Sequence, residues 1–182
     1  MQPRVPTLAP EAMNPQQRAA YEAILAGPRK IVEGPLAVWL QSAELAERAQ
    51  ALGAFCRFGT SLPPALSELA ILVTGAYWRA GFEWHVHAPI AQAAGVSAAA
   101  IAAMKAGEKV HFADEASQAV YDLARELWET RAVSDPVYQR AVTALGVAGT
   151  VELVGILGYY GLISMTIKAF HVPVPPGAEE PF

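Results

Sequence analysis

The segment 63–87, PPALSELAILVTGAYWRAGFEWHVH, decides the fold that the sequence predicts. Its two prolines open a helix in which residues 69–78 carry no charge, so the helix is apolar on nearly all sides. We therefore predict that this helix is central and buried. Gly81 marks a break or a close approach, and a second helix follows over residues 83–94.

The rest of the chain also has the periodicity and punctuation of helices, and no stretch alternates convincingly as a strand. Further helices are predicted over residues 14–26, 42–59, 97–104, 114–132, 134–146 and 150–170. Thr150 is expected to cap the last of them, and a short apolar segment follows Pro35. Both ends, 1–10 and 172–182, are rich in proline and predict extended arms. The sequence thus predicts a single all-α domain, residues 1–182, with about eight helices.

The composition indicates an oligomer. Charged residues make up 16% of the chain and apolar residues 53%, against averages of roughly 25% and 45–50%. A chain with so few charges has apolar surface to cover, and contact between subunits is the simplest way to cover it. The net charge of -4 has no strong local block, so neither nucleic acid nor an anionic membrane is an expected partner.

Cysteine content and hydropathy argue against a disulfide-bonded, secreted or membrane-spanning protein. Cys56 is the only cysteine, which excludes a disulfide within the chain and any mechanism that needs two thiols of one chain. Residues 1–13 lack the apolar run of a signal peptide, so we expect a cytoplasmic protein. The fifteen uncharged residues from Leu153 to Ile167 are short for a membrane span and predict a buried or interface helix.

Three residues are candidates for acid–base chemistry. Glu83 and His87 are four residues apart, so on a helix they project from one face. They form either a general acid–base couple beside an apolar helix or an ordinary ion pair on the surface. Glu68 lies near the start of the apolar helix, where the helix dipole favours an acid. Alternatively, it is a buried carboxylate that reaches the Glu83–His87 pair.

A metal centre is a weaker hypothesis. Glu83, His85, His87 and His111 are all potential ligands. However, the two histidines of the His-Val-His sequence diverge on a helix, and no cysteine set or zinc spacing supports them. We therefore predict that the protein binds no metal. His85, on a different face of the helix, is expected to line an opening or a subunit interface.

Four segments resemble the carboxymuconolactone decarboxylase family, which includes the alkylhydroperoxidase D-type proteins. They are 66–72 (LSELAIL), 82–91 (FEWHVHAPIA), 94–97 (AGVS) and the C-terminal stretch 152–175. The peroxidase branch of the family uses a glutamate, a Cys-x-x-Cys pair and a histidine. Glu68 and His87 take the glutamate and histidine positions, whereas the cysteine positions fall on Ala80 and Glu83. The resemblance therefore excludes a dithiol peroxidase cycle, which requires both thiols.

The decarboxylase branch is similar to this chain in having glutamate and histidine without the cysteine pair. The resemblance implies a multi-helix alkylhydroperoxidase D-like fold, a trimer or hexamer, and a cofactor-independent lyase that acts on a small organic acid or lactone. The implied catalytic residues are Glu68, Glu83 and His87. The expected pocket residues are Trp84, His85 and Arg79, with Arg79 and Arg57 the nearest cations in sequence. The alternatives are an alkylhydroperoxidase-like antioxidant protein, which the missing cysteines disfavour, and a non-catalytic binding or assembly protein.

Overall fold

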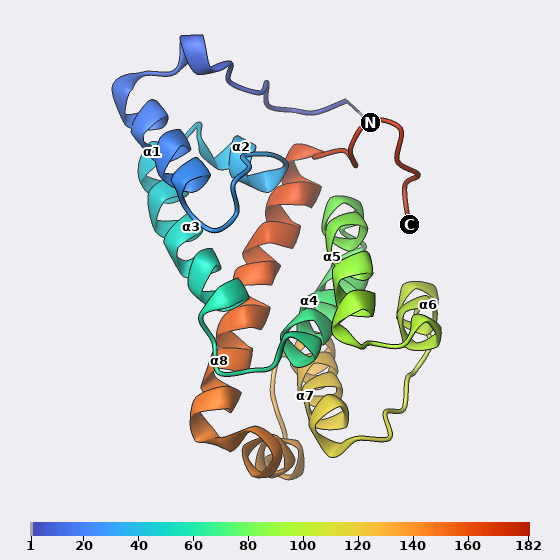
Figure 1. The fold of residues 1–182 in the computed structure, drawn as a ribbon. Coiled ribbons are helices and arrows are strands. Elements are labelled where there is room, and N and C mark those ends of the chain that lie inside the picture. Colours follow the sequence, from blue (N-terminus) through green and yellow to red (C-terminus); the bar gives the residue numbers. More distant parts are fainter. Residues whose placement is uncertain (1) are drawn as a thin grey trace.

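The structure is a computed structural model that describes residues 2–182, and it is built from helices joined by short connections (Figure 1). No strand occurs in this range, which confirms the predicted all-α class. The elements in chain order are the 3-10 helix η1 (Pro10–Ala12) and the helices α1 (Pro15–Ala26), α2 (Pro35–Trp39), α3 (Ala43–Phe58), α4 (Pro64–Trp78), α5 (Gly81–Ala94), α6 (Ala98–Ala106), α7 (Glu115–Thr130) and α8 (Asp135–Phe170).

The apolar helix α4 lies at the centre, as the sequence predicts. Its residues Leu66–Gly75 are all buried, because α5, α7 and α8 pack around it. The helix ends at Arg79, which adopts the left-handed conformation with φ of 47°. The amide of Ala80 then donates to the carbonyl of Gly75 at 2.9 Å, and α5 begins one residue later. This tight connection fixes α4 and α5 as a helical hairpin, so that residues of one can face residues of the other.

The last two predicted helices form one long element, α8, with a kink. Gly146 has φ of 73° and ψ of 169°, which is not helical, and the chain resumes its helix directly afterwards. The prediction that Thr150 caps the final helix is therefore wrong. Thr150 lies inside α8, and its hydroxyl donates back to the carbonyl of Gly146 at 2.8 Å. By contrast, α1 does begin with a side-chain cap, in which Asn14 and Gln17 form a reciprocal capping box.

Helix α8 runs through the length of the molecule and contacts α3, α4 and α7 (Figure 1). By length and composition alone it could cross a membrane, with 33% of its most apolar window buried. The core helix of a soluble protein meets the same criteria, so this is weak support for a span. The cytoplasmic location stays a prediction.

Both terminal arms pack on the same end of the molecule (Figure 1). The amide of Arg4 donates to the carbonyl of Phe170 at 3.0 Å, and its guanidinium donates to the carbonyl of Ala169. At the other end of the chain, the ring of Phe182 meets the ring of Trp84 edge-on, with centroids 5.3 Å apart. The C-terminal arm therefore covers the beginning of α5.

Candidate functional site

Two carboxylates and one imidazole meet between α4 and α5. Nδ1 of His87 lies 2.6 Å from Oε2 of Glu68, and Nε2 of His87 lies 3.0 Å from Oε1 of Glu83. All three side chains are at most 7% exposed. The structure thus brings together the three residues that the sequence singled out as catalytic. Glu83 and His87 are not a surface ion pair, because both are buried.

The local sequence explains this convergence. Glu83 stands in the first turn of α5, where the partial positive charge of the helix end stabilises an acid. His87 follows one turn later on the same face. Glu68 faces it from α4, because the tight hairpin brings the early part of α4 beside the second turn of α5. A buried charge needs a partner, and each of these groups has one.

The two carboxylates keep the imidazole protonated. Burial by itself lowers the pKa of His87, but the charge of Glu83, the hydrogen bond to Glu68, the close contact with Glu83 and the charge of Glu68 outweigh burial. Together they raise the pKa of His87 to about 9. His87 is therefore an imidazolium at neutral pH, held between two carboxylates.

Glu68 and Glu83 differ in how they contact His87. Nδ1 of His87 donates a short hydrogen bond to Glu68. The contact with Glu83 is within ion-pair distance, yet Oε1 of Glu83 accepts no well-aligned hydrogen bond. Glu83 therefore contacts the imidazole without a well-aligned hydrogen bond, whereas Glu68 holds the ring through the short bond to its Oε2.

A cavity of about 60 Å³ opens beside this cluster. Glu83 and His87 line it, but Glu68 does not and lies behind the imidazole. The ring of Tyr160 meets the ring of His87 edge-on at 5.2 Å between centroids and forms part of the wall. The other lining residues come from the loop before α2 and from α2, α3, α5 and α8, and they are Arg29, Ile31, Glu33, Pro35, Leu36, Arg57, Phe82, Val86 and Ile163.

Two arginines belong to this cavity, and only one of them was considered in the sequence. Arg57 is one of the two nearby cations that the sequence offered, and the structure places it in the wall. Arg29 was missed because it lies far from Glu83 in the chain, in the loop after α1. Tyr160 was also missed. The sequence signal for Tyr160 is its phenol hydroxyl, a polar group within the otherwise apolar, uncharged residues of α8.

The remaining predicted pocket residues lie elsewhere. Trp84 is buried against Phe182, and His85 is exposed on the outer side of α5. The guanidinium of Arg79 lies over the ring of Phe182 at 5.4 Å from its centroid. His111 is exposed between α6 and α7. Within residues 2–182, no group of three or more histidine, cysteine, aspartate and glutamate side chains is arranged to hold a metal ion.

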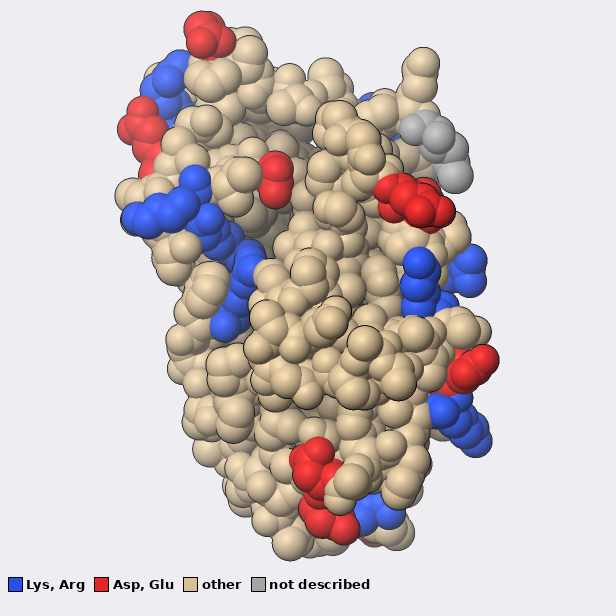
Figure 2. Space-filling view, turned by 45° about the vertical axis from the view of Figure 1, so that its right-hand side comes forward, with Lys and Arg blue, Asp and Glu red and all other residues tan. Residues whose placement is uncertain are grey.

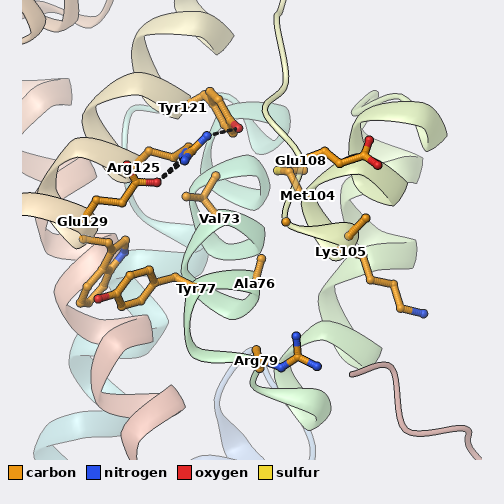
Figure 3. A pocket seen from close by; sticks show the side chains of 13 residues that line it. Val73, Ala76, Tyr77, Arg79, Met104, Lys105, Glu108, Tyr121, Arg125 and Glu129 are labelled. Carbon is orange, nitrogen blue, oxygen red and sulfur yellow. Dashed lines mark hydrogen bonds and ion pairs between the residues drawn. The ribbon is translucent and has the colours of Figure 1, made fainter.

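Arg79 instead lines a larger cavity of about 270 Å³ on the other side of α4, between α4, α6 and α7 (Figure 3). Three of its polar side chains, Tyr121, Arg125 and Glu129, contact one another. Arg125 forms an ion pair with Glu129 and donates to the hydroxyl of Tyr121 (Figure 3). None of Glu68, Glu83 and His87 lines this cavity. The smaller cavity is the better candidate site, because the buried acid–base cluster opens onto it.

Comparison with known proteins identifies the fold. No protein-family model and no curated protein matches the chain. A solved structure of a cysteine-to-alanine variant of the debrominase Bmp8, in complex with 2,3,4-tribromopyrrole, is similar with a TM-score of 0.74 and 13% identity. The match covers 95% of this chain and 91% of that one.

A second solved structure is a protein of unknown function from Agrobacterium tumefaciens, described as a candidate antioxidant defence protein AhpD. Its TM-score is 0.67 at 13% identity, with 79% of this chain and 99% of that one covered. At such identity the likeness establishes the AhpD-like fold and no activity. The predicted fold class is thereby confirmed, and membership of the carboxymuconolactone decarboxylase family stays a prediction.

Proposed function

We propose that the protein is a cofactor-independent acid–base enzyme, carboxymuconolactone decarboxylase-like, that acts on a small organic acid or lactone. The observation that carries this proposal is the buried cluster of Glu68, His87 and Glu83 on the wall of a small cavity. Enzymes place titratable groups in such surroundings to hold and transfer protons near neutral pH.

The geometry supports a division of roles. Glu68 orients His87 through Nδ1 and is a positioning residue, because it does not reach the cavity. His87 holds the proton, and Glu83, which lies 3.0 Å from Nε2 of His87 and lines the cavity, exchanges it with the substrate. In a decarboxylation, loss of carbon dioxide leaves an electron pair delocalised into the substrate carbonyl. A proton passes from Nε2 of His87 to Glu83 and then to the substrate carbon, and water restores it.

The antioxidant alternative has less support. The two cysteine positions of the peroxidase pattern are Ala80 and Glu83 in this chain. Cys56, the only thiol, is buried in α3 and does not line the cavity, and burial raises its pKa. A raised pKa disfavours the thiolate that attacks a peroxide. A thiol-based reaction on a halogenated ring has no more support, because no cysteine lines this cavity.

A deuterium experiment tests the acid–base function. The purified protein is incubated in D₂O with small carboxylated lactones and β-keto acids, and NMR follows loss of carbon dioxide and deuterium at the adjacent carbon. We expect at least one compound to lose its carboxylate or exchange that hydrogen faster than without protein. Binding without exchange across the panel would support the non-catalytic binding protein instead. Stoichiometric zinc or iron in the active protein would contradict the cofactor-free part of the proposal.

We also propose that the protein forms a homo-oligomer, a trimer or hexamer, through α3 and α8. Large apolar side chains are exposed along both helices, namely Leu45, Leu52, Phe55 and Phe58 on α3 and Val147, Val151, Val154 and Met165 on α8. Figure 2 shows that charged side chains leave large areas of the surface uncovered. Exposed apolar side chains gathered on two helices are typical of a contact between subunits.

Light scattering coupled to size exclusion measures the assembly. We expect three or six times the chain mass of 19.3 kDa. Val151, which is 67% exposed on α8, provides the test variant. Val151→Glu places a charge in the expected interface and should shift the protein toward a smaller species. Lys105→Glu, an exposed charge change on α6, should leave the assembly unchanged. A monomeric unaltered protein would contradict the proposal.

A further inference from the structure

Unpartnered polar atoms concentrate at the Glu83 cavity. Five buried side-chain nitrogen or oxygen atoms of the described residues have no hydrogen-bond partner. Three of them belong to residues that line this cavity: Nε of Arg29 and the hydroxyl of Tyr160 have no recorded partner, and Oε1 of Glu83 has only its ion pair with His87. Buried polar groups are nearly always hydrogen-bonded, so a cluster of exceptions at one cavity indicates a binding site.

Tyr160 presents a neutral donor to this cavity. Its side chain is 1% exposed, and its ring lies edge-on to His87. Burial raises the pKa of Tyr160 well above its ordinary value, and the charge of Glu83 adds to this effect while Arg29 and Arg57 oppose it. The hydroxyl therefore keeps its proton throughout the neutral range. Both nitrogens of His87 already face carboxylates, so the hydroxyl is free for an acceptor bound in the cavity.

The two arginines reach the wall beside neighbouring turns of α3, Arg29 from the loop after α1 and Arg57 from α3 itself. Arg29 crosses α3 at Gly53, where a Cβ would collide with its guanidinium and with the hydroxyl of Tyr159. Arg29 donates to that hydroxyl at 3.2 Å. Arg57 lies one turn after Gly53 on the same face of α3. The sequence thus needs glycine at position 53 to bring the two guanidinium groups to one side of the cavity.

These cations are not neutralised by neighbouring acids. Among residues 2–182, neither Arg29 nor Arg57 forms an ion pair with a carboxylate. Glu33 and Glu83 are the carboxylates in the wall. Glu33 is exposed, and Glu83 is within ion-pair distance of His87. Half-buried guanidinium groups without a carboxylate retain their capacity to bind an anion.

We infer that Arg29, Arg57 and Tyr160 form an anion subsite that binds a carboxylate. The anion subsite does not depend on the proposed function, but the description of the bound molecule as a substrate rests on it. Guanidinium groups match the two oxygens of a carboxylate, and the tyrosine hydroxyl adds a third donor. A cavity of about 60 Å³ admits a group of that size. The substrate is therefore an organic acid rather than an uncharged lactone, and its carboxylate is bound beside the proton-transferring Glu83.

Acetate and acetamide have nearly the same shape, but only acetate is charged, so the pair tests whether the cavity binds an anion. NMR titration at constant ionic strength measures their affinities for the full chain. We expect acetate to bind about tenfold or more tightly than acetamide, since hydrogen bonds to a charged group are the stronger ones. Arg57→Gln should weaken acetate binding by a similar factor. Tyr160→Phe, which removes one neutral hydrogen bond, should weaken it about fivefold.

Two matched variants control for general effects. Arg48→Gln changes an exposed arginine on α3 that pairs with Glu44, and Tyr138→Phe changes an exposed tyrosine on α8. Both should keep the acetate affinity of the unaltered protein. Tyr160→Phe also guards against misfolding as an explanation, because its hydroxyl has no partner to lose. Equal affinities for acetate and acetamide, or acetate binding that survives Arg57→Gln and Tyr160→Phe, would overturn the subsite.

The binding readout separates this inference from the proposed function. If acetate binds through Arg57 and Tyr160 but no compound is turned over, the anion subsite stands and the acid–base enzyme does not. If an uncharged lactone is turned over as efficiently as its carboxylated counterpart, the acid–base enzyme stands and the subsite is overturned as a determinant of specificity.

Discussion

Replacement of Glu83 by glutamine is expected to lower kcat by about 10²- to 10⁴-fold, the range that a positioned proton-transfer group contributes. Glutamine keeps the size of the side chain but cannot carry a proton from His87 to the substrate. Glu83 is the carboxylate of the cluster that lines the cavity, 3.0 Å from Nε2 of His87. Steady-state kinetics on the compound found in the deuterium experiment measures the effect, with KM expected to change less than kcat.

Glu68→Gln distinguishes a positioning role from direct transfer. Glu68 touches His87 and not the cavity, so its loss should reduce kcat less than the loss of Glu83. It should also shift the pH profile of kcat to lower pH, because the hydrogen bond that Glu68 accepts from His87 helps to raise the pKa of His87. Glu44→Gln, on the exposed face of α3, serves as the control.

A Glu83→Gln enzyme that retains activity within threefold would remove Glu83 from the proton path.

The acid–base pair was predictable because its geometry is local. A spacing of four residues within one helix places Glu83 and His87 on the same face, independently of the rest of the fold. Their burial was not predictable from this spacing alone, since an exposed pair has the same pattern. The charge-free residues 69–78 predicted only that the preceding helix lies inside, so the burial of the pair stayed open until the structure showed it. The residues alone left open whether Glu68 reaches the pair, and the family pattern favoured that alternative.

The anion-binding wall could not be predicted, because it is assembled from distant segments. Arg29 comes from a loop, and the close approach that admits it depends on Gly53 in a different helix. A glycine within a helix shows where a neighbour approaches closely but not which neighbour it is. Tyr160 gave no chemical signal in an apolar helix, where an aromatic residue is usually a packing residue. Arg57 was noticed by proximity in sequence, and only the fold assigned it to this wall.

The same limitation explains the error at the last helix boundary. Thr150 has the residue type of a helix cap, and Gly146 has that of a helix end. The backbone departs from helical geometry at Gly146 alone, and α8 then continues without a separate cap. A threonine side chain can return its hydrogen bond to the preceding turn as easily as it can cap a new helix. The break itself lies at Gly146, where the sequence ends the preceding helix, and only the cap is misassigned to Thr150.

The free energy of unfolding is expected to fall by about 3 kcal/mol between pH 6.5 and pH 9 because of His87. Its pKa is about 9 in the folded protein, against an ordinary value of 6.5. The folded state therefore binds the proton more tightly than the unfolded state. This stabilisation is fully present below pH 6.5 and is lost as the pH rises through 9. Deprotonation leaves a neutral ring between the buried carboxylates of Glu68 and Glu83, which is the physical origin of the loss.

Urea denaturation at intervals from pH 6 to pH 9.5 measures this dependence. His87→Gln should remove most of the slope, and it should also be less stable at pH 6.5, because Glu68 and Glu83 then lack their cation. Since that variant risks misfolding, Glu68→Gln provides a second measurement, in which a milder loss of one partner reduces the slope. His111→Gln changes an exposed histidine and should retain the full slope. A flat stability curve for the unaltered protein across this window would mean that His87 is neutral in the folded state. The proton that Glu83 is proposed to deliver would then have no source in the cluster.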